Sequence, residues 1–318
     1  MRCVVVGGGS WGSVFSTLLV ARGHYVVLAC RDPVQARTIA DTGHNPRYLR
    51  DVDLSGVRAT TIDQAPLAEA DLVALAVPSR AFGEVVADLP GRAPVLVLTK
   101  GLDPATGLRL SELVTDRPVA VLSGPNHAEE IAQGLPAASV IACSDIELAT
   151  RLQNALISPI FRVYVNDDVV GVELCAAAKN VIALAAGGVD GLRLGDNGKA
   201  GLISRGLREM ARLGEACGAR PETFSGLAGM GDLVVTCWSR HSRNRRAGEL
   251  LARGFTPEAA TREIGMVVEG ITAAPVLGEL AKRLGVEMPI IDAVGAVLRG
   301  TAPLSLVSSL MEREPTTE

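Results

Sequence analysis

A short glycine-rich turn near the start of the chain constrains the fold more than any other feature. The apolar run Cys3–Val6 leads into Gly7-Gly8-Gly9-Ser10-Trp11-Gly12, and an apolar stretch that favours a helix follows it. In a dinucleotide-binding unit, the first glycine permits the tight turn, the second lets the backbone approach the pyrophosphate, and the third lets helix and strand pack closely. The helix N-terminus then offers N–H groups to the phosphates. We predict that Gly7, Gly9 and Gly12 serve a dinucleotide, against the alternative of an ordinary glycine-rich turn.

The first half of the chain alternates apolar, β-branched runs with helical stretches, which is typical of a parallel sheet covered by helices. The near-continuous apolar character of the runs favours strands that are buried on both faces. The expected strands are Cys3–Val6, Tyr25–Cys30, Leu72–Ala76, Val95–Leu98, Val119–Leu122, Ala138–Ala142 and Phe161–Tyr164. The expected helices are Gly12–Ala21, Pro33–Asp41, Arg80–Asp88 and Leu148–Leu156.

The second half of the chain reads as helical throughout. Its clearest pattern is an apolar residue at every third or fourth position from Ile203 to Cys217. The expected helices are Val169–Ala186, Ala200–Gly218, Thr256–Ile264 and Thr272–Leu284. We therefore predict an α/β protein with an N-terminal Rossmann-type parallel-sheet domain, residues 1–166, followed by an all-helical C-terminal substrate and catalytic domain, residues 167–318. A chain of 318 residues is long enough for two such domains.

Composition and charge exclude several classes of partner. The formal net charge is −4 and the basic residues are dispersed, which argues against nucleic acid or an anionic membrane as a partner. No two cysteines have the spacing of a zinc site, and we expect no metal. Most cysteines lie in apolar segments, where a reduced thiol fits a cytoplasmic protein. The most apolar later stretch, Val169–Val189, contains Glu173 and Lys179, so we do not expect a membrane span.

The end of the second expected strand bears on the choice between NAD and NADP. An acidic residue there usually holds the ribose diol of NAD, whereas an arginine suits the 2′-phosphate of NADP. Arg31 stands at the strand end, and Asp32 follows at the sequence distance expected for NAD. We expect NADP to be preferred, with NAD as the alternative.

A lysine stands in the middle of the most apolar helix expected in the second half. Lys179 shares its helix face with small residues at Cys175, Ala176 and Ala183, which leave room for a ligand. Burial would lower the pKa of its ammonium and make it a usable general base. The alternative is a lysine that reaches from a half-buried helix to water.

Two further polar segments support a site in the second half. Gly226–Leu233 reads as a glycine-rich turn that presents the carboxylate of Asp232. Ser242-Arg243-Asn244 places a hydroxyl, a guanidinium and an amide in succession, which suits a phosphate. The remaining basic residues between Arg240 and Arg246 fit a solvated surface.

At these residues the sequence resembles the bacterial NAD(P)-dependent glycerol-3-phosphate dehydrogenases. The resemblance extends in family order from residue 4 to about residue 300. It rests on Gly7–Gly12, Asn45-Pro46-Arg47-Tyr48-Leu49, Thr99-Lys100-Gly101, Ser123-Gly124-Pro125, Lys179-Asn180, Gly195-Asp196-Asn197, Gly226–Leu233, Ser242-Arg243-Asn244 and Val267–Gly270.

The resemblance implies reduction of dihydroxyacetone phosphate to sn-glycerol 3-phosphate by NAD(P)H, which would feed glycerophospholipid synthesis. It implies that Lys179 handles the proton at the substrate oxygen, as base in oxidation and as donor in reduction. The implied substrate contacts are Lys100, Gly124, Asn126, Asp232, Ser242, Arg243 and Asn244. The implied cofactor contacts, beside the glycines, are Ser10, Trp11, Arg31, Lys100, Ala128, Arg243, Val267 and Glu269. Helical domains of this kind often pair through apolar faces, which suggests a homodimer.

Two positions depart from the family pattern. Asn126 replaces the usual serine or threonine, and Ala176 replaces the usual glycine three residues before the lysine. We expect altered kinetics or substrate preference from these changes. The alternative functions are a related two-domain dehydrogenase of another small phosphorylated or β-hydroxyacid substrate, and a non-catalytic sensor of NADPH. The combination of Asp232 with Ser242-Arg243-Asn244 favours the triose phosphate.

Overall fold

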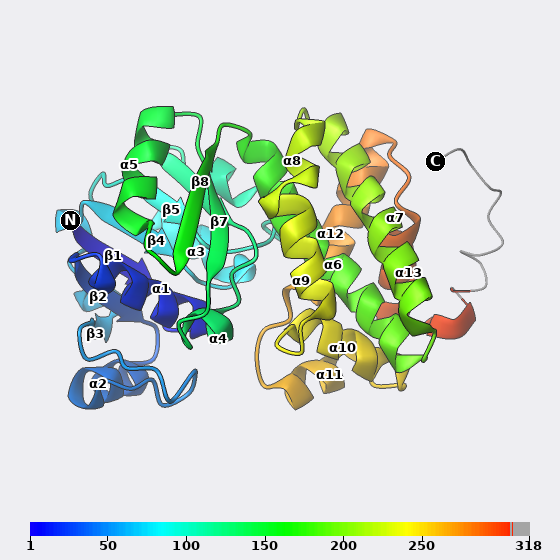
Figure 1. Cartoon of the computed structure of the whole chain (residues 1–318), viewed down its shortest axis with the longest axis horizontal. Coiled ribbons are helices and arrows are strands. Elements are labelled where there is room, and N and C mark those ends of the chain that lie inside the picture. Colours follow the sequence, from blue (N-terminus) through cyan, green and yellow to red (C-terminus); the bar gives the residue numbers. More distant parts are fainter. Residues whose placement is uncertain (306, 308–318) are drawn as a thin grey trace. The chain divides into compact units, whose positions relative to one another are not determined.

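The computed structural model describes residues 1–305 and residue 307 of the chain. The chain divides into two compact units, Met1–Glu173 (unit 1) and Leu174–Glu318 (unit 2). The division falls inside one helix, α6 (Val169–Gly191). Unit 1 contains the sheet and unit 2 is helical, which confirms the predicted fold class (Figure 1).

Unit 1 is built on an eight-stranded sheet with the order β3-β2-β1-β4-β5-β6-β7-β8. The strands are β1 (Arg2–Val6), β2 (Tyr25–Cys30), β3 (Arg58–Thr61), β4 (Leu72–Leu75), β5 (Val95–Val97), β6 (Val119–Ser123), β7 (Ala137–Ala142) and β8 (Phe161–Asn166). All seven predicted strands are present. β3 was missed because this edge strand has the sequence Arg-Ala-Thr-Thr and is only partly buried, so it lacks an apolar run.

The expectation of a wholly parallel sheet needs one correction. β6 and β7 pair antiparallel, whereas every other neighbouring pair of strands is parallel. Only a short segment containing α4 (Ala128–Ile131) separates β6 from β7. The connection has 13 residues, which is at the lower limit for a parallel crossover, and α4 within it is only four residues long, which suits a reversal of the chain.

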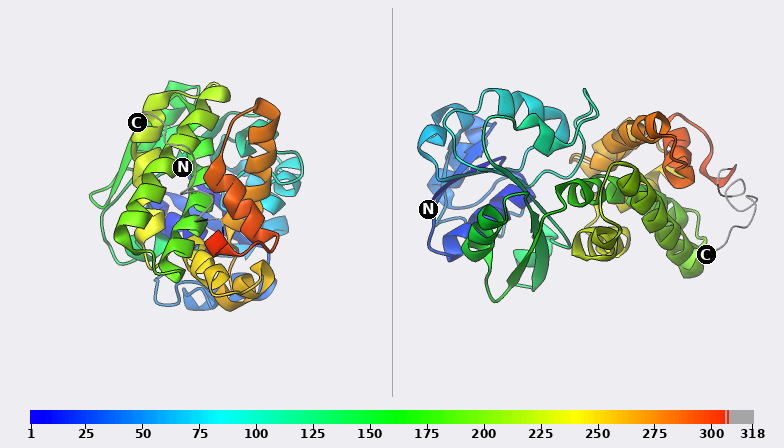
Figure 2. Two further views of the ribbon diagram at one scale, coloured as in Figure 1. Left: turned by 90° about the vertical axis from the view of Figure 1, so that its right-hand side faces the viewer. Right: turned by 90° about the horizontal axis from the view of Figure 1, so that it is seen from above.

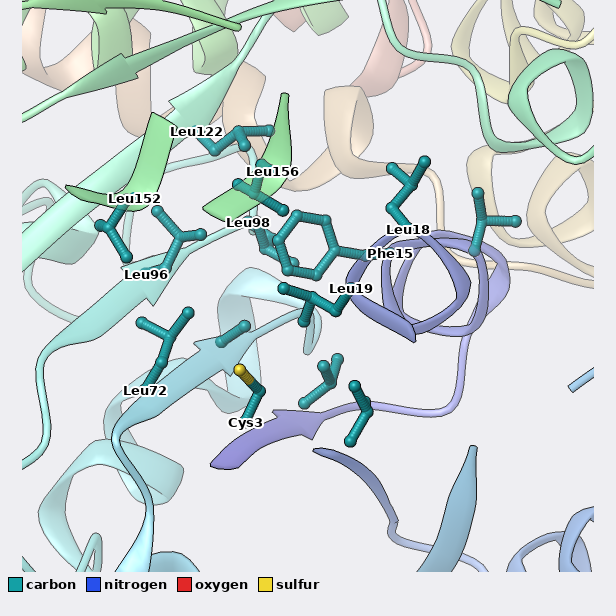
Figure 3. Close-up of a cluster of buried hydrophobic side chains, with 14 of the residues drawn as sticks. Cys3, Phe15, Leu18, Leu19, Leu72, Leu96, Leu98, Leu122, Leu152 and Leu156 are labelled. Carbon is teal, nitrogen blue, oxygen red and sulfur yellow. The ribbon is translucent and has the colours of Figure 1, made fainter. Parts of the chain in front are cut away.

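Helices cover the sheet of unit 1. α1 (Ser10–Ala21), α2 (Pro33–Thr42), α4 and α5 (Ile146–Leu156) contribute to one hydrophobic core with alternate residues of the strands, such as Val26 and Leu28 of β2. In this core Phe15 of α1 projects over the strands toward Leu156 of α5 (Figure 3). α3 (Ser79–Ala87) and the short 3₁₀ helices η1 (Ile62–Gln64), η2 (Leu67–Glu69) and η3 (Leu110–Leu113) lie on the other side (Figure 2). The central strands β4 and β5 are thus buried on both faces, as their composition predicted. The edge strand β8 departs from that prediction, because Arg162 and Tyr164 on one of its faces are exposed.

Unit 2 consists of the rest of α6 and a series of further helices. These are α7 (Gly195–Ala216), α8 (Pro221–Ser225), the π-helical turn η4 (Leu227–Gly231), α9 (Asp232–Trp238), α10 (Arg243–Ala252), α11 (Pro257–Ile264), α12 (Glu269–Leu284) and α13 (Pro289–Leu298). Four of these helices, α8, α9, α10 and α13, were not predicted from the sequence. The glycine-rich segment after Gly226 was predicted as a turn, but it continues helically into α9.

Two glycines let α6 and α10 approach each other at backbone distance. A Cβ atom on Gly187 of α6 would lie 1.8 Å from the carbonyl oxygen of Arg245, and one on Gly248 of α10 would lie 1.9 Å from that of Leu184. Neither position therefore accepts a side chain without separating the helices. The crossing fixes the start of α10 against α6.

α6 is the one helix among the described residues that is long and apolar enough to cross a membrane. Within its most apolar window, 83 % is buried inside the structure. Its charged residues are also paired: Glu173 with Arg109, Lys179 with Asp232, and Asp190 with both Lys199 and Arg245. These features are those of a core helix.

Candidate active site

The glycine turn of unit 1 has the geometry that the sequence predicted. Gly7 has φ +118°, and a Cβ there would lie 2.5 Å from the carbonyl oxygen of Ala76. A Cβ on Gly12 would lie 1.9 Å from the carbonyl oxygen of Gly7, so the third glycine brings α1 against the turn. Around Gly9 the corresponding space is empty to 4 Å, which leaves the backbone open to a ligand. A dinucleotide pyrophosphate fits this turn.

Trp11 in the first turn of α1 adds a second indication of a ligand. Its ring packs against Phe15 and Phe161, with centroid distances of 5.7 and 6.4 Å. Its indole Nε1 is buried and has no hydrogen-bond partner among the residues that the structure describes. A buried donor without a partner costs free energy, so a cofactor acceptor at this place would satisfy it.

Arg31 and Asp32 follow β2 directly, but their side chains differ in exposure and in hydrogen bonding. Arg31 is exposed, as a contact to a 2′-phosphate requires. Asp32 is the N-cap of α2: its Oδ1 accepts hydrogen bonds from the backbone N–H groups of Val34 at 2.9 Å and of Gln35 at 3.4 Å. A carboxylate engaged in this way is less available for a ribose diol, which favours NADP.

Three predicted substrate residues of unit 1 come together beyond the carboxyl ends of β5 and β6. Nζ of Lys100 donates to the carbonyl oxygen of Gly124 at 3.0 Å and to Oδ1 of Asn126 at 2.8 Å. Asn126 is buried and its Nδ2 donates to Ser139 at 2.9 Å. The asparagine that departs from the family pattern thus holds the lysine directly. Ala128, a predicted cofactor contact, begins α4 just beyond it.

The centre of unit 2 is a buried ion pair. Nζ of Lys179 on α6 lies 2.6 Å from Oδ1 of Asp232 and donates to Oγ1 of Thr236 at 2.8 Å. Oγ1 of Thr236 in turn donates to the carbonyl oxygen of Asp232 at 2.6 Å. Burial disfavours the ammonium charge, whereas the adjacent carboxylate favours it. The charged form is the one that can donate a proton.

The thiol nearest in sequence to this cluster is chemically inert. Burial raises the pKa of Cys237, the residue after Thr236, to about 12. The thiolate is the reactive form of cysteine, so Cys237 is not a nucleophile at neutral pH.

Four predicted residues meet at the start of α10. Ser242 is the N-cap, and its hydroxyl accepts the N–H of Arg245 at 3.2 Å. The exposed Arg243 donates to the carbonyl oxygen of Val267 at 2.8 Å. Buried Asn244 accepts from the backbone N–H of Gly270, which follows Glu269 at the start of α12, at 2.9 Å.

Asn244 also connects this group to the lysine. Its Nδ2 donates to Oδ1 of Asn180 at 2.8 Å, and Asn180 is the neighbour of Lys179 on α6. Nδ2 of Asn180 donates to the carbonyl oxygen of Ala176 at 3.0 Å. Unit 2 therefore holds two hydrogen-bonded groups that meet at the neighbouring residues Lys179 and Asn180 of α6, and Arg243 is exposed at the start of α10.

Sequence reasoning missed several polar residues of unit 2. Thr236 stands four residues after Asp232 on one helix, but this spacing carried no signal while the preceding segment was read as a turn. Lys199 is buried, with its Nζ 2.7 Å from Asp190 and 4.8 Å from the ring centroid of Trp238. Nε of Arg245 reaches the same oxygen of Asp190 at 2.6 Å, which further fixes α10 on α6.

Comparison with known proteins agrees with this arrangement. The sequence model described as NAD-dependent glycerol-3-phosphate dehydrogenase N-terminus matches residues 2–149, and the corresponding C-terminus model matches residues 168–308. The chain is 45 % identical to the glycerol-3-phosphate dehydrogenase (NAD(P)+) of Moorella thermoacetica over 99 % of this chain and 96 % of that one. It is 47 % identical to the Thermus thermophilus enzyme of that name over the full length of both. The crystal structure of glycerol-3-phosphate dehydrogenase from Coxiella burnetii superposes with a TM-score of 0.94 at 37 % identity, covering 98 % of this chain and 99 % of that one.

Proposed function

The chain belongs to the NAD-dependent glycerol-3-phosphate dehydrogenase family, and from this we propose that it reduces dihydroxyacetone phosphate to sn-glycerol 3-phosphate with NAD(P)H. It is accordingly an NAD(P)-dependent oxidoreductase. The observation that carries the assignment in this chain is the buried Lys179, which Asp232 and Thr236 hold at 2.6 and 2.8 Å. Full-length relatives at 45 and 47 % identity support the same reaction.

Lys179 is proposed to supply the proton of the reaction. The bound nicotinamide cofactor supplies the hydride, so the protein has to orient the substrate and protonate one oxygen. In reduction, Nζ of Lys179 donates a proton to the carbonyl oxygen as negative charge develops there. Asp232 favours the charged donor, and Thr236 fixes the direction of the ammonium.

Arg243 is proposed to capture the phosphate of the substrate, together with Ser242 and Asn244. It is exposed at the start of α10, where the N-terminal end of the helix also favours an anion. Lys100, Gly124 and Asn126 are proposed as the contacts from unit 1.

The cofactor is proposed to bind at the glycine turn, and NADP is proposed to be preferred over NAD. The turn leaves Gly9 open, Trp11 offers an unsatisfied Nε1, and Arg31 is free of the capping role that engages Asp32. Ser10 and Ala128 of unit 1 and Val267 and Glu269 of unit 2 complete the proposed set.

A cytoplasmic location and a homodimer are also proposed. All six cysteines are free thiols, and five of them are buried, which suits a reducing compartment. The family supplies glycerol 3-phosphate to phospholipid synthesis. Analytical ultracentrifugation at several protein concentrations would test the homodimer.

The proposed reaction is tested by following NADPH absorbance after addition of dihydroxyacetone phosphate to the purified protein. We expect rapid oxidation of NADPH, and much slower oxidation with unphosphorylated dihydroxyacetone. In the reverse direction, 3-hydroxyisobutyrate and 6-phosphogluconate with NADP+ test the alternative dehydrogenases. An absence of turnover of the triose phosphate with both NADPH and NADH would overturn the proposal.

A further inference from the structure

A buried amide network behind the glycine turn holds one carbonyl group of the turn from two sides. The carbonyl oxygen of Gly8 accepts a hydrogen bond from Nε2 of Gln35 at 2.6 Å and another from Nδ2 of Asn45 at 3.0 Å. Gln35 belongs to α2 and Asn45 to the segment that follows it. Two side chains distant in sequence from the turn thus converge on a single backbone oxygen.

Asn45 is the centre of this network. It is 1 % exposed, and its Nδ2 also donates to Oγ of Ser13 in α1 at 2.9 Å. Its Oδ1 accepts hydrogen bonds from Nε2 of Gln35 and from the backbone N–H groups of Arg47 and Tyr48, each at 3.1 Å. The side chain therefore links the glycine turn, α1, α2 and its own segment.

Holding the carbonyl of Gly8 also determines where the N–H of Gly9 points. The two groups belong to one planar trans peptide, in which C=O and N–H face opposite directions. Because the C=O is directed inward to Gln35 and Asn45, the N–H of Gly9 is directed to the opposite, ligand side of the turn. Glycines flank this peptide on both sides, so the backbone itself opposes rotation of the peptide only weakly.

Resting on the proposed function, we propose that Gln35 and Asn45 are positioning residues for the cofactor: they lock the Gly8–Gly9 peptide with its N–H toward the pyrophosphate. Neither residue needs to touch the cofactor for this role. Without these two hydrogen bonds, the cofactor has to orient the peptide when it binds, and this lowers its binding free energy. The loss of affinity concerns only the contacts to the pyrophosphate, so the affinity for the adenosine end of the cofactor stays unchanged.

The test uses Gln35→Met, which keeps the volume of the side chain and removes its donor, and Asn45→Ala. The matched control is Thr38→Ala, a half-buried position on the same helix whose hydroxyl donates to the carbonyl oxygen of Val34. Equilibrium binding of NADPH and of adenosine 2′-monophosphate, which has no pyrophosphate, is measured by calorimetry without substrate. A protein that failed to reduce dihydroxyacetone phosphate would still report on the turn in this assay.

For Gln35→Met we expect the Kd of NADPH to rise about tenfold, the scale of the one hydrogen bond that the Gly8 carbonyl loses, with a larger rise for Asn45→Ala. The Kd of adenosine 2′-monophosphate should stay within about twofold, and so should kcat at saturating NADPH and the KM of dihydroxyacetone phosphate. Equal losses for both ligands, or an unchanged Kd of NADPH in Gln35→Met, would overturn the proposal. Gln35→Met decides the question if Asn45→Ala does not fold.

Discussion

Nζ of Lys179 and Oδ1 of Asp232 lie 2.6 Å apart, and their side chains are only 6 and 2 % exposed. A buried ion pair is expensive to form, because both charges lose their hydration. Such a pair is weak evidence for a stabilising role. The pair lies beside Thr236 and Asn180, in the unit that also contains the exposed Arg243. This arrangement favours a catalytic role for the pair over a stabilising one.

Removal of the lysine should separate the catalytic from the structural effect of this pair. We expect Lys179→Met to lower kcat by a factor of about 10² to 10⁴, the usual contribution of a general acid. The unpaired carboxylate should also cost about 3–5 kcal/mol in the free energy of unfolding. The double variant Lys179→Met/Asp232→Asn should recover much of this stability but none of the activity. Steady-state kinetics and urea unfolding measure the two effects, and a lysine variant that kept most of its kcat would refute the proposed proton donor.

Thr236→Val tests the direction that the hydroxyl gives to the lysine. Valine is nearly isosteric but cannot accept the hydrogen bond from Lys179, so we expect kcat to fall about tenfold while the KM of NADPH stays nearly constant. Thr261→Val is the matched control, since its Oγ1 donates to the carbonyl of Pro257 four residues earlier, as that of Thr236 does to Asp232. Equal kinetic losses in both variants would show that the effect is one of helix packing.

Glu209 should make the stability of the protein depend on pH. This buried residue of α7 accepts hydrogen bonds from the N–H groups of Ile290 at 2.8 Å and Ile291 at 3.4 Å, at the start of α13. Burial raises its pKa from 4.5 to about 7, against the smaller lowering effects of these two hydrogen bonds and of Arg212, and Asp292 adds to the increase. Between these pH values the folded protein binds more protons than the unfolded chain, so this contribution to stability declines as pH rises from 4.5 to 7.

Glu209→Gln mimics the protonated carboxyl and still offers an acceptor to Ile290. Relative to the parent, its free energy of unfolding should gain roughly 3 kcal/mol at most between pH 5 and pH 8. Denaturant titrations of both proteins across this range measure the difference. Parallel curves for the two proteins would mean that Glu209 titrates normally.

The contrast between Arg31 and Asp32 predicts two different outcomes for cofactor selection. Arg31→Ala should raise the KM of NADPH about tenfold and change that of NADH little, since only NADPH carries a 2′-phosphate. Asp32→Asn should leave both KM values within about twofold, because asparagine caps a helix as well as aspartate does. A marked rise in the KM of NADH for Asp32→Asn would instead identify Asp32 as a ligand of the ribose.

The sequence predicted the sheet well because buried strands and the glycine turn have strong local signals. The prediction from sequence failed where the local pattern was weak or was compatible with more than one structure. The edge strand β3 has no apolar run, and the apolar composition of β6 and β7 is the same for antiparallel as for parallel pairing. The glycines at 226, 229 and 231 suggested a turn, but Gly229 is required for packing, as a Cβ there would lie 2.1 Å from the carbonyl oxygen of Phe224.

The sequence singled out candidate site residues by their type, but it did not indicate which of them contact one another. Lys179 and Asp232 were recognisable, yet 52 residues separate them, and no periodicity links positions so far apart. The capping role of Asp32 was open to sequence reasoning, since aspartate before Pro33 is a common helix start. The convergence of Gln35 and Asn45 on Gly8 was not, because it depends on the path of the chain after α2.

The crossing of α6 and α10 has a mechanical consequence for the substrate. Helices separated by side chains can slide as those side chains change rotamer. At Gly187 and Gly248 backbone meets backbone, so no side chain is present to readjust. We therefore expect Arg243 at the start of α10 and Lys179 on α6 to keep a constant spacing when ligands bind and leave. If Arg243 binds the phosphate and Lys179 the carbonyl oxygen, as proposed, a fixed spacing selects substrates by the distance between these two groups, and a ketone with one more carbon between them should be a poorer substrate.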